Sequence, residues 1–157
     1  YANRLARMLS ADVYNRAIGG DTFFTALLEA EEVCRPDIVT VAYGTNDWWK
    51  HNPVKFAKEC GEFYRKLSEK FPAAKIFAVT PIWRSNFDME TPFGAPTYET
   101  EAVIRRCTQN LPNVTVIPGW NLVPHHEGFM ADKSLHPNDL GFAEYARNLY
   151  EAMKKFL

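Results

Sequence analysis

Short apolar runs alternate along the whole chain with segments whose hydrophobic residues recur at helical spacing. The clearest run is Asp37 to Tyr43 (DIVTVAY), which is nearly continuous and contains several β-branched residues. Such a run suits a strand covered on both faces, as the strands of a parallel sheet are. The alternation therefore predicts an α/β fold with a parallel sheet between layers of helices. The expected strands are residues 12–17, 37–43, 75–80 and 114–117.

Helices are expected between these strands. One should begin near Pro53, because proline is favoured in a first helical turn. Others are predicted over 2–9, 22–34 and 99–109, and from Asn138 or Asp139 onward. Residues 81–96 show no periodicity and predict a long loop, which in compact domains is often functional. The buried stripes predicted for the Pro53 helix and the last helix are Phe56, Cys60, Phe63 and Leu67, and Phe142, Ala146, Leu149, Met153 and Phe156.

Composition limits the domain count and the partners. A chain of 157 residues is the size of one domain, so residues 1–157 are expected to form a single unit. The formal net charge of −1 leaves no basic surplus to neutralise phosphates, which argues against nucleic acid or an anionic membrane as the main partner. No apolar run approaches the roughly 18 residues of a membrane span.

Cysteine and histidine usage argues against a metal. The three cysteines, Cys34, Cys60 and Cys107, are widely spaced and form no CxxC pair. This pattern disfavours a zinc site or a disulfide framework, and favours buried, reduced thiols in a cytoplasmic protein. The adjacent His125 and His126 have no convincing third ligand nearby. We therefore expect neither a metal nor another cofactor.

Three polar blocks stand where ligands bind in open α/β sheets, near the carboxyl ends of strands. Residues 15–22 (NRAIGGDT) overlap the end of the first expected strand, and residues 44–47 (GTND) follow the most hydrophobic one. Residues 132–139 (DKSLHPND) precede the last helix. In order and spacing, the three blocks resemble those of the SGNH/GDSL hydrolase family. The resemblance covers the whole chain and implies a three-layer α/β/α, flavodoxin-like fold and serine ester hydrolysis.

The resemblance also implies a role for one residue of each block, and for the acid beside the histidine. His136 would be the general base, because histidine titrates near working pH. Asp132 would hydrogen-bond the other ring nitrogen. The backbone N–H of Gly20 and the side-chain amide of Asn46 would hold the oxyanion, and a glycine lets the main chain approach the substrate closely. Asp47 is expected to brace its loop and not to act in catalysis.

The sequence departs from the family pattern in two respects. The acid normally lies three residues before the histidine, where this chain has Lys133, so a local bulge would have to bring Asp132 to the imidazole. The Gly-Asp-Ser block on the first, central strand is also missing, and the chain opens on a helix. We expect the nucleophile upstream of Tyr1, with the first strand truncated, disordered or supplied by another chain. No serine present fits that role: Ser10, Ser68, Ser85 and Ser134.

Three functions remain open from the sequence. The first is an esterase that acts on acyl esters or acetylated carbohydrates, in which aromatic and basic residues near the long loop shape a substrate cleft. The second is a catalytically inactive module of this fold, or a fragment that binds a partner. The third, a flavodoxin-like nucleotide binder, lacks a glycine-rich phosphate loop. The cleft candidates are Trp83, Arg84, Phe87 and Tyr98, while Trp48 and Trp49 suit surface packing or a pocket wall equally.

Overall fold

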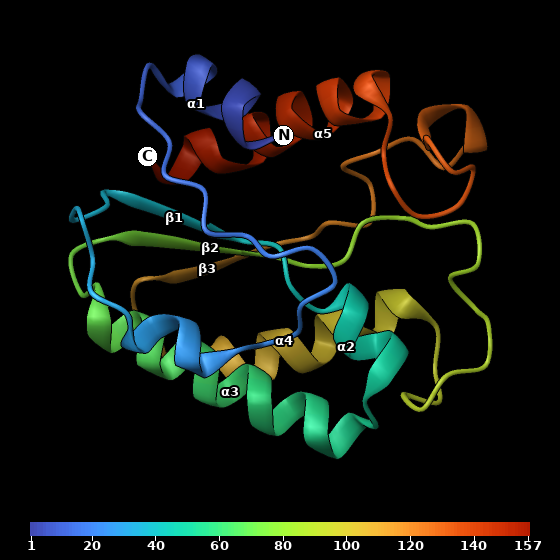
Figure 1. The fold of residues 1–157 in the computed structure, drawn as a ribbon, viewed down its shortest axis with the longest axis horizontal. Coiled ribbons are helices and arrows are strands. Elements are labelled where there is room, and N and C mark those ends of the chain that lie inside the picture. Colours follow the sequence, from blue (N-terminus) through green and yellow to red (C-terminus); the bar gives the residue numbers. More distant parts are fainter.

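A parallel sheet of three strands forms the centre of the protein in the computed structural model, which describes all 157 residues. The strands lie in the order β1 (Ile38–Val41), β2 (Lys75–Val79) and β3 (Val114–Ile117). All three were expected from the sequence, and their bounds agree closely. Because the strands are parallel, their carboxyl ends share one edge of the sheet, on the right in Figure 1.

Helices cover both faces of the sheet, so the predicted three-layer α/β/α fold is confirmed (Figure 1). Two helices lie side by side on one face: α1 (Ala2–Leu9) and α5 (Asp139–Met153). Three lie on the other side: α2 (Thr45–Lys50), α3 (Pro53–Lys70) and α4 (Thr100–Thr108). Single 3₁₀ turns complete the elements: η1 (Thr25–Glu29), η2 (Thr97–Glu99), η3 (Glu127–Phe129) and η4 (Lys154–Phe156). None of the helices combines the length and the apolar character that crossing a membrane requires.

The two longest helices begin where the sequence predicted, and an asparagine caps each of them. The Asn52 side chain accepts a hydrogen bond of 2.9 Å from the N–H of Lys55, and Pro53 is the first residue of α3. The Asn138 side chain accepts one of 2.9 Å from the N–H of Gly141 in α5. Each cap satisfies one of the N–H groups that a helix start leaves unpaired. The second cap also fixes the chain directly after His136.

The central strand explains the two separate cores. Ile76 and Ala78 of β2 pack on the α3 side, whereas Phe77 and Val79 pack on the α5 side, and all four are at most 1% exposed. The predicted α3 stripe is buried, as are three of the five residues predicted for α5. Phe142 is only partly buried. Phe156 is exposed, because α5 ends at Met153 and the chain turns. The confirmed stripe residues are Phe56, Cys60, Phe63 and Leu67, and Ala146, Leu149 and Met153.

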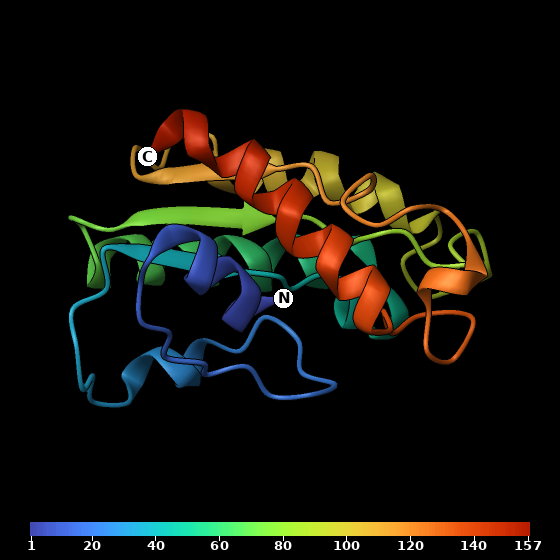
Figure 2. The same ribbon diagram turned by 90° about the horizontal axis from the view of Figure 1, so that it is seen from above.

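Two predictions for the first third of the chain are wrong. Residues 12–17 form no strand, because a strand needs a hydrogen-bonding neighbour and they run unpaired on the β1 side of the sheet (Figure 2). Residues 22–34 are not a continuous helix. Phe23 packs on α3 in a non-helical segment and η1 packs beside it with Leu28 against the core, but residues 30–34 are mostly exposed and would bury little by becoming helical. Cys34, expected to be buried, lies in that remainder and is exposed.

Replacing Leu149 with Ala should lower the free energy of unfolding by about 2–5 kcal/mol, because the side chain is fully buried in the core under α5 and its loss leaves a cavity. Leu140→Ala in the same helix is the matched control. Leu140 is 56% exposed, so its loss should cost no more than about 0.5 kcal/mol. Urea denaturation of the two variants measures both values, and equal losses would contradict the packing described here.

Candidate functional site

Asp47 joins two of the polar blocks. Its side chain is fully buried, and its Oδ2 accepts a hydrogen bond of 3.1 Å from the N–H of Gly44 at the start of α2. Its Oδ1 accepts one of 3.0 Å from the N–H of Phe23. Burial raises the pKa of Asp47, while these hydrogen bonds and His51 oppose the rise. The expected bracing role of Asp47 is therefore confirmed.

Gly44 is required where α2 begins. Its φ of 114° lies in a region that residues with side chains rarely adopt, and a Cβ there would lie 3.1 Å from Cγ of Pro81. The sharp turn lets Asn46 and Asp47 follow β1 immediately, at the carboxyl edge of the sheet.

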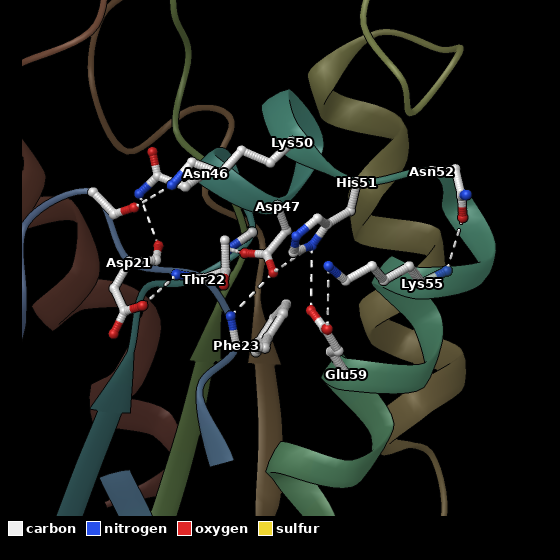
Figure 3. Close-up of polar contacts among 12 residues, drawn as sticks. Asp21, Thr22, Phe23, Asn46, Asp47, Lys50, His51, Asn52, Lys55 and Glu59 are labelled. Atoms are coloured by element: carbon white, nitrogen blue, oxygen red, sulfur yellow. Dashed lines mark hydrogen bonds and ion pairs between the residues drawn. The ribbon is translucent and has the colours of Figure 1, made fainter. Parts of the chain in front are cut away.

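Asp47 joins the segment of residues 21–23, which Gly20 precedes, to the helix that carries Asn46; Figure 3 shows the segment from Asp21 and the helix. Nδ2 of Asn46 donates a hydrogen bond of 2.8 Å to the carbonyl of Asp21, and Nζ of Lys50 donates one of 2.7 Å to the carbonyl of Gly20. The φ of Gly20 is +78°, which favours glycine at this turn. The N–H of Gly20 makes no hydrogen bond within the protein. Two donors thus stay available on adjoining segments: that N–H and the second hydrogen of the Asn46 amide.

Asp132 and His136 contact each other in the loop before α5. Oδ2 of Asp132 lies 2.7 Å from Nδ1 of His136. Because an ionised carboxylate can only accept hydrogen bonds, Nδ1 carries the proton, and the lone pair of His136 is left on Nε2. The His136 side chain is 73% exposed, so Nε2 is open to a group that approaches from outside.

A left-handed residue accommodates the extra position in this block. The φ of Lys133 is 61°, which turns the chain so that Oδ1 of Asp132 accepts hydrogen bonds from the N–H groups of Ser134, Leu135 and His136, at 2.9, 2.8 and 3.1 Å. This is the local bulge that the sequence requires. These hydrogen bonds, the one from Leu135 first, hold the pKa of Asp132 well below its usual range.

Together, Arg84 and Asn86 contact both α2 and the block of residues 132–139. The guanidinium of Arg84 lies 4.8 Å from the ring centre of Trp48 in α2, and its Nε donates a hydrogen bond of 2.7 Å to Oδ1 of Asn86. Oγ of Ser134 is 3.4 Å from the same oxygen. Burial lowers the pKa of Arg84, and Asp132 opposes that shift. The structure therefore brings Asp132 and His136 into contact and places Asn46 against Asp21, the neighbour of Gly20, while Arg84 packs on Trp48 of the helix that carries Asn46.

An aromatic cluster borders the long loop. The rings of Trp83 and His125 stack at 5.7 Å with an interplanar angle of 12°, and Trp120 contacts His125, Phe87 and Tyr98 at its edges. Three of these residues were singled out in the sequence. Trp120 and the stacking of His125 were missed, because neither lies in a motif and only the fold brings the two loops together. Of the two other tryptophans, Trp48 is fully buried and Trp49 is 46% exposed.

Solved structures of similar fold share little sequence with this chain. A possible lipase from Chitinophaga pinensis is 16% identical, with a TM-score of 0.73 over 99% of this chain and 88% of that chain. A salicylyl acyltransferase from a tetracycline biosynthetic pathway is 18% identical, with a TM-score of 0.75 over 99% of this chain but only 48% of that chain. A peptidoglycan O-acetylesterase is 19% identical, with a TM-score of 0.60 over 76% of this chain and 37% of that chain.

Sequence comparison identifies the family of the chain, which the structural similarities alone do not. No curated protein sequence matches it significantly. The sequence profile of the GDSL-like lipase/acylhydrolase family matches residues 1–143. That match covers all three polar blocks and agrees with the fold of the structural neighbours. The chain therefore belongs to the GDSL-like lipase/acylhydrolase family.

Proposed function

We propose that the chain is the greater part of a serine ester hydrolase in which His136 is the general base. The observation that carries the proposal is the contact of 2.7 Å between Nδ1 of His136 and Asp132, which leaves Nε2 exposed and able to accept a proton. Family membership and the fold shared with esterases and an acyltransferase support the same reaction class.

The reaction divides into proton transfer and oxyanion stabilisation. A serine hydroxyl attacks the ester carbonyl, and Nε2 of His136 takes the hydroxyl proton while Asp132 stabilises the imidazolium. The N–H of Gly20 and the amide of Asn46 donate hydrogen bonds to the oxyanion. His136 then returns the proton to the leaving alcohol, and water releases the acyl group by the same steps.

We place the nucleophilic serine on a segment that precedes Tyr1. Two observations support this placement. β1 pairs with a strand on one side only, so its outer edge could take another parallel strand. Two of the four serines are also engaged elsewhere: Oγ of Ser68 in α3 donates to Asn113, and Oγ of Ser134 lies against Asn86. A second chain could also supply the strand.

Two substrate classes are proposed, short acyl esters and O-acetylated carbohydrates. Structural neighbours include a peptidoglycan O-acetylesterase and a carbohydrate esterase, and the aromatic cluster around Trp120 suits the stacking of a sugar ring. An activity screen of the full-length protein against p-nitrophenyl esters and acetylated sugars tests the proposal. No turnover of either class, with the protein folded, would favour the alternative: an inactive module of this fold that binds a partner.

Replacing Asn46 with Ala should lower kcat by roughly 10²–10³, because one preorganised donor to the oxyanion is lost. The KM should change much less, since the donor acts mainly in the transition state. Asn148→Ala is a matched control: the Asn148 amide also donates to a backbone carbonyl, that of Leu122 at 3.1 Å, but from α5. Steady-state kinetics of both variants decide the point, and a kcat of Asn46→Ala within a few-fold of the parent would contradict the assignment.

A further inference from the structure

Three ligating side chains meet at the junction of α2 and α3, outside the ester-hydrolysis site. His51 ends α2, Asp47 lies one turn before it, and Glu59 comes from α3. Nδ1 of His51 lies 3.2 Å from Oε2 of Glu59 and 3.7 Å from Oδ1 of Asp47. One ligand atom from each residue lies within 4.8 Å of the other two. Figure 3 shows the imidazole facing both carboxylates.

Nδ1 of His51 is a buried polar atom without a hydrogen bond. His51 is 9% exposed, and although Oε2 of Glu59 is close enough, the ring nitrogen is not aligned for a hydrogen bond with it. An unsatisfied buried nitrogen is costly, so the arrangement calls for an explanation. Ligands of one metal ion have this relation, because each points at the ion and not at its neighbour.

The separations suit a tetrahedral ion. With bonds of about 2.0–2.2 Å, two ligands of tetrahedral Zn²⁺ lie about 3.4 Å apart. The observed distances from Nδ1, 3.2 and 3.7 Å, lie on either side of that value. An imidazole combined with two carboxylates also favours Zn²⁺ over Mg²⁺ or Ca²⁺, which prefer oxygen ligands alone.

The local charge is in favour of a cation. Asp47 is fully buried and Glu59 is 30% exposed, so two carboxylates share a site that is partly closed to water. The nearest ammonium is Nζ of Lys55, which lies 3.7 Å from the other oxygen of Glu59 and leaves Oε2 directed toward His51. No lysine or arginine forms an ion pair with Asp47.

We propose that Asp47, His51 and Glu59 bind one Zn²⁺ ion. Because Oδ1 of Asp47 also accepts the hydrogen bond from Phe23, the ion would tie three segments together: the loop that carries Gly20, α2 and α3. Its role is structural: the ion would fix α2, which carries Asn46, against α3 and the loop, and it would not contact the ester. The site goes beyond the proposed hydrolase activity and does not depend on it.

Titration of metal-free protein with Zn²⁺ tests the site, with a competing chromophoric chelator to report the Kd. We expect one ion per chain and, at a hundredfold excess over the Kd, a rise in Tm of about 5 °C or more. Mg²⁺ should give no rise. Co²⁺ in place of Zn²⁺ should give the visible absorption of a tetrahedral site.

Two variants and a control identify the ligands. His51→Ala and Glu59→Gln should each abolish the Tm rise and the Co²⁺ absorption; Glu59 is partly exposed, so its variant should fold even if the buried histidine proves essential for folding. His126→Ala removes a surface histidine of the adjacent pair and should leave both signals intact. Loss of binding in His126→Ala with retention in the other two, or no stoichiometric binding to the parent protein, would overturn the proposal. Neither readout uses activity, so failure here leaves the hydrolase assignment unaffected.

Discussion

Replacing His136 with Ala in the full-length protein should lower kcat for p-nitrophenyl acetate by roughly 10⁴- to 10⁶-fold, the range for removing a member of such a triad. Without the imidazole, no group accepts the proton of the attacking serine. The His136 side chain is 73% exposed and its ring contacts only Asp132 by hydrogen bond, so the fold should survive the change. Steady-state kinetics measure the loss, and the Tm checks the fold.

His125→Ala is the matched control for this experiment. Its ring also lies at the carboxyl edge, where Nε2 is 2.9 Å from the carbonyl of Trp120, but it has no carboxylate partner. The kcat of His125→Ala should stay within about tenfold of the parent, because losing a packing contact with the substrate lowers kcat far less than losing the general base does. Equal losses in the two variants would show that His136 acts only through packing.

The same assay applied to residues 1–157 alone locates the nucleophile. If the serine lies upstream of Tyr1, this polypeptide should hydrolyse p-nitrophenyl acetate no faster than buffer. Turnover that His136→Ala abolishes in the 157-residue chain would place the nucleophile within it instead. Turnover would therefore mean that the 157 residues contain the serine. Its absence in the folded chain, whose base His136 is present, would mean that they do not.

The sheet and its two cores were predictable because their signals are local. β2 is apolar on both faces, since side chains alternate between two cores, and the α3 stripe has helical spacing in a single continuous segment. The caps Asn52 and Asn138 are equally local, because each accepts a hydrogen bond from a residue three positions on. Such features need no knowledge of the rest of the fold.

The predictions failed where long-range contacts decide the structure. The run Asp12 to Ala17 has strand-like composition, but no strand lies beside it, and unpaired residues gain nothing from an extended conformation. His51 and Glu59 lie eight positions apart on different helices, in no motif, and only the turn at Asn52 brings them together. Arg84 is similar: it was seen as a residue of the loop, but its place against Trp48 comes from the packing of that loop on α2.

The candidate site combines local features, which the sequence predicts, with long-range contacts, which it does not. The proximity of Asp132 and His136 could be expected because they lie four positions apart, but the left-handed turn at Lys133 that makes the contact possible could not. The contact of Asn46 with Asp21, next to Gly20, is supported by Asp47, whose bracing role the block itself suggested. What no pattern revealed is that Arg84 packs on Trp48 of α2, the helix that carries Asn46.

Asp132→Asn should lower kcat by about 10⁴-fold while leaving the fold of the loop intact. Oδ1 of Asp132 accepts three backbone hydrogen bonds, so the oxygen of an asparagine must occupy that position and its NH₂ must replace Oδ2. The NH₂ would then donate to Nδ1 of His136, which forces the ring proton onto Nε2. An imidazole protonated at Nε2 cannot accept the serine proton.

Asp132→Ala separates this tautomer effect from the support of the loop. It removes the acceptor of the three N–H groups as well, so it should lower kcat at least as far and also increase protease cleavage between Ala131 and Pro137. Asp139→Asn, which makes the same change of charge in the first turn of α5, should keep both activity and protease resistance. Full activity in Asp132→Asn would mean that another group orients the imidazole.

The pH dependence adds an independent test. The pKa of Asp132 is held well below its ordinary value of about 4, so the carboxylate remains ionised throughout the range in which the enzyme is assayed. Its contribution to stability is complete above that ordinary value and is lost only as the pH falls through the depressed pKa. An NMR titration that follows the side-chain carboxyl carbon of Asp132 should therefore show its protonation step only below the ordinary value. A protonation step at or above the ordinary value would show that the hydrogen bonds from Ser134, Leu135 and His136 do not hold the carboxylate as described.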